Sequence, residues 1–114
     1  MSVLGVDLRA SSKKPSSIAV LDTQSHLTEL GSFYEDSELT KLVDDLRPDL
    51  VAIGAPLNLP SGFCCLDQTC DCRFSVSDRK GRLLELQLAK MGISCFYTNK
   101  GSIIRDLIYR GIHL

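Results

Sequence analysis

Four cysteines lie close together in the middle of the chain, and thiols at such spacing can hold a metal ion. They are Cys64, Cys65, Cys70 and Cys72, in the stretch CCLDQTCDC. Together they could supply four thiolates to Zn²⁺ or to an iron–sulfur cluster. The spacing differs from the usual paired C-x-x-C pattern, and adjacent cysteines rarely share one ion, so free thiols stay an equal alternative. We expect residues 61–77 to form a cysteine-rich insertion loop.

A second chemical candidate is Asp7, the one acid of the apolar stretch Val3–Leu8. A buried carboxylate without a partner is costly, so such an acid is usually held by a metal, a partner or a hydrogen-bonding site. Cleavage of a phosphodiester with Mg²⁺ or Mn²⁺ needs several carboxylates around the ions. An acid at position 54 would complete such a set, but the chain has Gly54 there. The alternative is that Asp7 is hydrogen-bonded near a strand end.

Cations offer a third kind of site. The polar loop Arg9–Ser17, which contains Lys13, could cradle a phosphate, although it lacks the glycines of a P-loop. Further cations after the cysteines could form one face for phosphate oxygens. They are Arg73, Arg79, Lys80, Arg82, Lys100, Arg105 and Arg110. A solvated loop and ordinary charged helix surfaces are the simpler alternatives.

The elements that must position these residues follow from the hydropathy pattern. It predicts strands over Val3–Leu8, Ile18–Leu21, His26–Tyr34, Leu50–Ile53 and Ile93–Tyr97. It predicts helices from the N-cap Ser37 to Pro48, over Lys80–Met91, and from the cap Ser102 to the end of the chain. A strand–helix–strand unit implies parallel pairing of Leu50–Ile53 with Val3–Leu8. We expect an α/β fold with a mixed five-stranded sheet in the order 3-2-1-4-5 and helices on its faces.

The two later helices each carry an apolar face. In the helix predicted over Lys80–Met91, the residues expected to point inward are Leu83, Leu84, Leu88 and Met91. Cys95 is expected in the core. Ile103, Ile104, Leu107, Ile108 and Ile112 form a stripe on the last helix. The stripe predicts that a C-terminal part is lacking or that a second copy covers it in a homodimer.

Length and composition set the broad class. The chain has 114 residues, a net charge of −1 and 44% hydrophobic residues, which is typical of one small globular domain. No overall basic field draws it to nucleic acid or to an anionic membrane. It has no apolar run of the roughly 18 residues that span a bilayer, and it begins without a signal-peptide core. We therefore expect a cytoplasmic protein without a membrane partner.

The motifs in this order resemble a known family. The chain is similar to a bacterial and archaeal family of unknown function (domain of unknown function 429). The resemblance is carried by GVDL, a hairpin, VAIGAPLNLPSG, CCLDQTCDCR, LQLAKMGI and YTNKGSIIRDLIYRGI. The family is considered to consist of predicted nucleases with a ribonuclease H-like fold. The resemblance covers nearly the whole chain and implies a single domain over residues 1–114. The family usually continues past this point.

The resemblance carries over to a few residues. Asp7 matches the acid of the family's first strand, and Gly54 stands where the family pattern reads Asp, in a motif like I-D-A-P-L. Asp71 and Arg73 match a C-D-x-R-like stretch. The resemblance implies a nuclease with Asp7 binding Mg²⁺ or Mn²⁺. In such a nuclease we expect Asp71 to be a second catalytic acid and Arg73, together with Lys13 of the polar loop, to bind the phosphates of nucleic acid. Glycine at position 54 removes half of that metal site.

Two other functions stay open. The chain could be a non-catalytic module that binds nucleic acid or protein and holds a metal through its cysteines. It could also be a phosphate-handling protein of the sugar-kinase and actin type, which shares the strand–loop–strand beginning. A second glycine-rich phosphate turn is absent from the sequence, which disfavours the last of these.

Overall fold

The structure is a computed structural model that describes residues 1–76 and 79–114. The chain divides into two compact units, Met1–Ala55 together with Leu114, and Pro56–His113. We call them the first and the second unit. Ser77, the last residue of the predicted cysteine-rich loop, lies outside the described residues.

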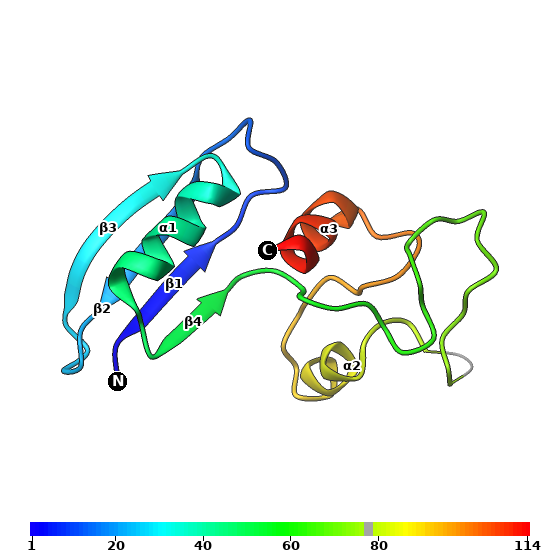
Figure 1. The fold of residues 1–114 in the computed structure, drawn as a ribbon. Helices are drawn as coiled ribbons and strands as arrows, with labels where there is room; N and C mark the ends of the chain where they lie inside the picture. Colours follow the sequence, from blue (N-terminus) through cyan, green and yellow to red (C-terminus); the bar gives the residue numbers. More distant parts are fainter. Residues whose placement is uncertain (77–78) are drawn as a thin grey trace. The chain divides into compact units, whose positions relative to one another are not determined.

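The first unit is built on a four-stranded sheet in the order β3-β2-β1-β4 (Figure 1). The strands are β1 Val3–Asp7, β2 Ser16–Leu21, β3 Leu27–Phe33 and β4 Leu50–Ile53. β2 pairs antiparallel with both β1 and β3, whereas β4 pairs parallel with β1. The structure thus confirms a mixed α/β fold and the predicted order of the first four strands.

Hydrogen bonds between Ser2 and Asp49 fix the register of β4 on β1. The Asp49 carboxylate accepts from the Ser2 backbone N–H at 2.7 Å and from the Ser2 hydroxyl at 2.9 Å. Both bonds lower the pKa of the Asp49 carboxyl, and the bond from the Ser2 backbone N–H has the larger effect. In the resulting register Val6 lies opposite Ile53, and the Gly54 N–H donates to the Val6 carbonyl at 2.8 Å. Residue 54 therefore lies next to the end of β1.

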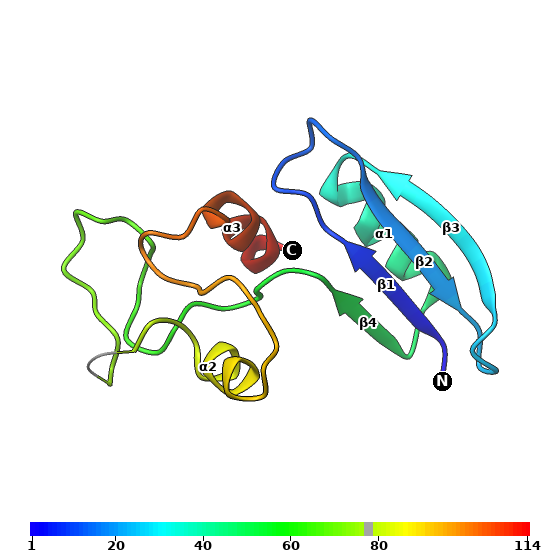
Figure 2. The same ribbon diagram turned by 180° about the vertical axis from the view of Figure 1, so that it is seen from behind.

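One helix, α1 (Asp36–Leu46), covers one face of this sheet (Figure 1). Figure 2 shows the opposite face of the sheet, turned toward the viewer. The core of the unit consists of the buried side chains Leu4, Val6, Leu8, Ile18, Val20, Phe33 and Leu39. The predicted N-cap Ser37 is wrong. Glu35 takes that position, because Glu38 accepts its backbone N–H at 2.8 Å in a capping box.

The second unit is mostly irregular chain with two helices, α2 (Leu83–Lys90) and α3 (Arg105–His113). The fifth strand predicted over Ile93–Tyr97 is wrong, since the described residues of that segment form no strand. Both helices are also shorter than predicted at their N-termini. The last helix begins at Arg105 and not after Ser102.

A buried carboxylate organises the start of α2. Glu85 is only 3% exposed, and its carboxylate accepts from the Thr98 N–H at 2.8 Å and the Thr98 hydroxyl at 2.5 Å. It also accepts from the Arg82 N–H at 2.8 Å and from Arg82 Nε at 2.9 Å. Burial raises the pKa of the Glu85 carboxyl, but the bonds from Thr98 and Arg82 together outweigh it, and the net shift is downward. The network joins α2 to the segment before α3.

This network reverses the predicted orientation of α2. Leu83, Leu84 and Met91 were expected to point inward, yet they are 53%, 56% and 73% exposed. Leu88 is partly buried, and Cys95, expected in the core, is exposed. The helix turns Glu85 inward because four donors, two from Arg82 and two from Thr98, meet at its carboxylate. That orientation was not predictable from hydropathy alone.

Apolar burial in the second unit is small. Leu66 and Ile108 are fully buried, and they are the only two large apolar residues of this unit that belong to the core among the described residues. From the predicted stripe of α3, Ile108 is buried, whereas Ile103 precedes the helix and is 83% exposed. A homodimer through this helix stays a prediction.

Candidate metal centre

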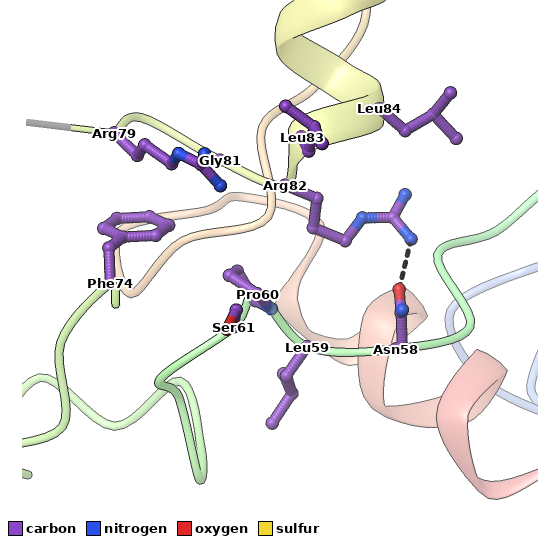
Figure 3. A pocket seen from close by; sticks show the side chains of 10 residues that line it. All are labelled: Asn58, Leu59, Pro60, Ser61, Phe74, Arg79, Gly81, Arg82, Leu83 and Leu84. Carbon is purple, nitrogen blue, oxygen red and sulfur yellow. Dashed lines mark hydrogen bonds between the residues drawn. The ribbon is translucent and has the colours of Figure 1, made fainter. Parts of the chain in front are cut away.

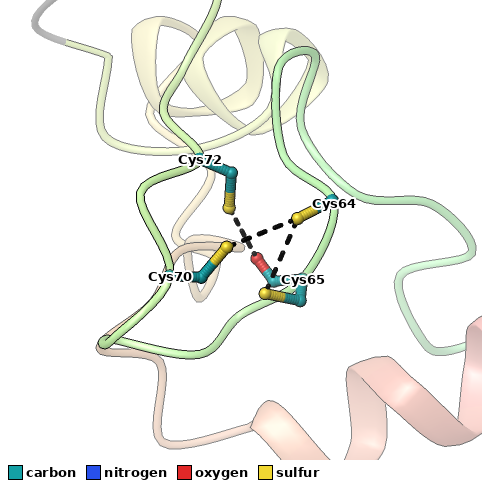
Figure 4. Close-up of side chains that lie close together, drawn as sticks. All are labelled: Cys64, Cys65, Cys70 and Cys72. Atoms are coloured by element: carbon teal, nitrogen blue, oxygen red, sulfur yellow. Dashed lines mark hydrogen bonds between the residues drawn. The ribbon is translucent and has the colours of Figure 1, made fainter.

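The four clustered cysteines converge on one point. Their sulfur atoms point toward one another (Figure 4) and all lie within 4.8 Å of each other. Cys64 Sγ lies 3.9 Å from Cys65 Sγ and 3.5 Å from Cys70 Sγ. These separations are too long for disulfides, and all four residues are free thiols. The adjacent pair Cys64 and Cys65, which the sequence suggested would not share an ion, does point to a common centre.

The distances match a single tetrahedral metal ion. Zn–S bonds of about 2.3 Å in a tetrahedron place the sulfurs about 3.8 Å apart. The two measured separations, 3.5 and 3.9 Å, lie on either side of that value. An iron–sulfur cluster distributes its thiolates over two or more irons, which separates the sulfurs further than one ion does. The arrangement therefore fits one ion better than a cluster.

The loop is closed at its base, which holds the thiols together. Ser75 N–H donates to the Ser61 carbonyl at 2.9 Å, and the hydroxyls of the same two serines are 2.9 Å apart. The rings of Phe63 and Phe74 stack above this closure with their centroids 4.4 Å apart. The two arms that carry the cysteines therefore leave the base side by side.

Gly62 makes that closure sterically feasible. Its φ is +96°, a conformation that residues with a side chain rarely adopt, and a Cβ there would lie 2.2 Å from the Arg73 carbonyl oxygen. The position therefore requires glycine both for its backbone angle and for the space beside the opposite arm.

We expect Gly62→Ala to weaken zinc binding by roughly ten- to a hundredfold, the range found when groups behind metal ligands are altered. The added methyl group forces the two arms apart. Competition with a chromophoric chelator measures the affinity. Gly92→Ala is the matched control, since Gly92 also has a positive φ, +78°, but a Cβ there meets no atom within 4 Å. Equal losses in both variants would show that backbone strain, and not closure of the loop, is responsible.

Hydrogen bonds within the cluster separate the thiol pKa values. Bonds to Cys70, and then to Cys72 and Cys65, raise the pKa of the Cys64 thiol to about 12. A hydrogen bond from the backbone of Cys64 stabilises the Cys72 thiolate against the opposing effect of burial, and the pKa of Cys72 falls to about 6. At neutral pH, Cys72 is therefore the thiolate ready to meet a metal ion. The Cys64 thiol must release its proton as the ion binds.

Two residues outside the loop hold it, and the sequence did not predict either. The Lys100 ammonium donates to the Cys70 carbonyl and lies 5.6 Å from the centre of the Phe63 ring. The Tyr109 hydroxyl, on α3, accepts from the Leu66 N–H at 2.8 Å. No spacing signal could have revealed these contacts, because the partners are 30 and 43 positions apart in the chain.

Asp7, the other predicted metal ligand, lies in the first unit. It is exposed at the end of β1, and its Oδ1 is 4.0 Å from where a Cβ at Gly54 would stand. Among the described residues, no group of three or more possible metal ligands includes it. The predicted pairing of β1 with β4 is thus present beside Asp7, but position 54 carries glycine instead of a second acid.

The remaining predicted site residues are divided between the two units. Lys13 is exposed in the β1–β2 loop, where it lines a hollow of about 360 Å³ with Arg9, Ser11 and Lys14. Asp71 and Arg73 are exposed residues of the second unit, on the arm that carries Cys70 and Cys72. The structure therefore brings the four cysteines together, and the catalytic and phosphate-binding roles of the other residues stay predictions.

Comparison with known proteins adds no relative: no protein-family model, curated protein or solved structure matches this chain. No helix in the described part of the chain has the length and apolar character needed to cross a membrane. The function must therefore be inferred from the chain's own side chains and their geometry.

Proposed function

We propose that this chain is a zinc-binding module in which Cys64, Cys65, Cys70 and Cys72 hold one Zn²⁺ ion that stabilises the second unit. The observation that carries the proposal is the convergence of four sulfurs within 4.8 Å. Thiolates are soft ligands, which favour Zn²⁺ over Mg²⁺ or Mn²⁺, and a set of four in this geometry suits a tetrahedral ion.

The ligand set makes the role of the ion structural. Four thiolates fill all four positions of a tetrahedral zinc ion and leave none for water or substrate. Catalytic zinc sites instead keep one position open. Together with the single carboxylate at Asp7, this favours the binding module of nucleic acid or protein over a hydrolase. The ribonuclease H-like type of fold is part of the proposal, supported by the 3-2-1-4 strand order.

Metal analysis of the purified chain tests the proposal. Elemental mass spectrometry is expected to find one zinc per chain after expression in zinc-supplemented medium. Iron together with acid-labile sulfide would indicate a cluster instead. A chain that stays free of metal and does not take up added Zn²⁺ at neutral pH would contradict the proposal.

A second candidate, a nuclease dependent on Mg²⁺ or Mn²⁺, is supported by one observation. Asp7 is exposed at the end of β1, directly beside the end of the parallel strand β4. Carboxylates at the ends of two such neighbouring strands can share metal ions. Position 54 has room for the missing one, because the nearest atom to a Cβ there is the Val6 carbonyl oxygen at 3.4 Å.

We expect Gly54→Asp to create a Mn²⁺ site that the unaltered chain lacks, because it places a second carboxylate next to Asp7. Titration calorimetry measures the binding, and a labelled single strand of DNA or RNA reports cleavage. The double variant Asp7→Asn, Gly54→Asp serves as the control and should lose the new site. Mn²⁺ binding of equal strength in all three proteins, or cleavage by the unaltered chain that survives Asp7→Asn, would contradict this assignment.

A further inference from the structure

The second unit contains a pocket that is separate from the four thiols. It has a volume of about 350 Å³ and lies between the segment Asn58–Ser61 and the beginning of α2 (Figure 3). Its lining residues are Asn58, Leu59, Pro60, Ser61, Phe74, Arg79, Gly81, Arg82, Leu83 and Leu84. Pockets of this size accommodate small organic ligands.

The charge of the pocket is positive. Two arginines, Arg79 and Arg82, line it, and no aspartate or glutamate does among the residues that the structure describes. These two were part of the cationic set singled out in the sequence, and Arg73 and Lys80 are not in the lining. Two cations of that set therefore lie in one cavity. Charged residues that only keep a surface solvated have no need to share a cavity.

The two arginines differ in how they are held. Arg82 is fixed, since its Nε bonds the Glu85 carboxylate at 2.9 Å and its Nη1 donates to Asn58 Oδ1 at 2.7 Å (Figure 3). Most of the charge of Arg82 is balanced by Glu85. Arg79 is half-buried and has no ion pair or hydrogen bond to any residue in the described ranges. Its guanidinium therefore keeps its full capacity to bind an anion, and planar guanidinium groups suit phosphate oxygens.

The rest of the lining is apolar with two hydrogen-bonding side chains. Phe74 contributes an aromatic ring to the lining, and Leu83 and Leu84 contribute exposed apolar side chains. Ser61 and Asn58 add a hydroxyl and an amide. An aromatic ring in one pocket with an arginine that has no partner among the described residues can bind a nucleotide, because the base stacks on the ring while the phosphate meets the guanidinium.

We propose that this pocket binds a nucleoside monophosphate group, with the phosphate on Arg79 and the base against Phe74 and the neighbouring leucines. The group can be a free nucleotide or the phosphorylated end of a single strand. Arg82 acts as a positioning residue that keeps Asn58 and the beginning of α2 in place. The proposal goes beyond the zinc site and uses none of its thiols.

Fluorescence anisotropy with a labelled nucleoside monophosphate tests the proposal on the zinc-loaded chain. Arg79→Gln is expected to weaken binding about tenfold or more, the loss of one charge-assisted hydrogen bond. Lys90→Gln is the matched control, since Lys90 is an exposed cation of the same unit that does not line the pocket, and it should bind as the unaltered chain does. Zinc content and the circular dichroism spectrum, measured in parallel, should be the same in all three proteins.

Further ligands define the chemistry. The nucleoside without phosphate and inorganic phosphate alone are both expected to bind at least tenfold more weakly than the nucleotide. A single strand with a 5′-phosphate that competes as well as the free nucleotide identifies a strand end, and one that does not compete identifies a free nucleotide. Equal binding by Arg79→Gln and the unaltered chain, equal losses in Arg79→Gln and Lys90→Gln, or equal affinity for nucleoside and nucleotide would each overturn the proposal. Since zinc content is measured separately, a failure here is distinguishable from a failure of the zinc site.

Discussion

The double variant Cys70→Ser, Cys72→Ser is expected to bind no zinc and to lose the ordered structure of the second unit. Serine hydroxyls do not replace thiolates as zinc ligands at neutral pH, and two of the four ligands are removed. Structural zinc contributes about 10–16 kcal/mol of binding free energy in small zinc domains at pH 7, and that energy is folding energy. No other substitution proposed for this chain is expected to remove as much folding free energy.

The packing of the second unit explains why it should depend on the ion. Within the described ranges the second unit has only two buried apolar core residues, Leu66 and Ile108, whereas the first unit has seven. Small units with little apolar interior usually need a metal or disulfides to fold. We therefore expect loss of the metal to affect the second unit far more than the first.

Metal analysis and circular dichroism, with amide hydrogen exchange to separate the two units, measure the outcome. Cys95→Ser is the matched control, because Cys95 is an exposed thiol of the same unit outside the cluster. It should keep one zinc per chain and full exchange protection. A double variant that retains zinc and melts like the unaltered chain would refute the assignment of the ligands.

Replacing Glu85 with glutamine is expected to lower the free energy of unfolding by about 3–5 kcal/mol, the usual cost of removing one partner of a buried ion pair. The Arg82 side chain is only 19% exposed and would keep its charge without the carboxylate 2.9 Å away. Glutamine also has only one acceptor oxygen for the donors of Arg82 and Thr98. Urea unfolding of the zinc-loaded protein measures the difference.

The same variant should change the dependence of stability on pH. The pKa of the Glu85 carboxyl is lower in the folded chain than its ordinary value. Its contribution is therefore present above the unfolded pKa of about 4.3 and is lost as the pH falls through the lower folded value. The glutamine variant should lack this component. Gln87→Ala, an exposed change on the same helix, should stay within about 0.5 kcal/mol of the unaltered chain. An equally small effect of Glu85→Gln would show that the network is dispensable.

The first unit was predictable because its signals are local. The apolar runs Val3–Leu8 and Ile18–Leu21 predicted two strands, and the structure has them as β1 over Val3–Asp7 and β2 over Ser16–Leu21. Leu50–Ile53 was predicted with its observed bounds, and Pro48 ended the helix before it. Strand order followed from the strand–helix–strand connection, which constrains how a short chain can return to its sheet.

The second unit was less predictable because polar contacts determine it. Hydropathy expects leucines to turn inward, but in α2 the inward residue is Glu85, which is satisfied by Thr98 thirteen positions away. Such a partner cannot be read from periodicity. The segment 93–97 has the composition of a strand, yet strands form only against a partner edge, and the described structure gives it none.

The candidate metal site was half predictable. Four thiols close together in the chain pointed to a metal, but the adjacency of Cys64 and Cys65 argued against a shared ion. A bend at Cys64, together with the closure at Ser61 and Ser75, turns both sulfurs to one side. In the pocket, Arg82 meets Asn58 across 24 positions, and nothing in their spacing indicates that they lie together.

The contact of Tyr109 with the cysteine loop would link α3 thermodynamically to the proposed zinc ion. A ligand that holds α3 in place must raise the affinity for zinc by the same factor by which zinc raises the affinity for that ligand. Slow exchange of the α3 amides in the presence of zinc, and faster exchange after chelation, would make this helix a reporter of metal occupancy. The supply of zinc in the cell would then determine how stable α3 is when a partner binds it.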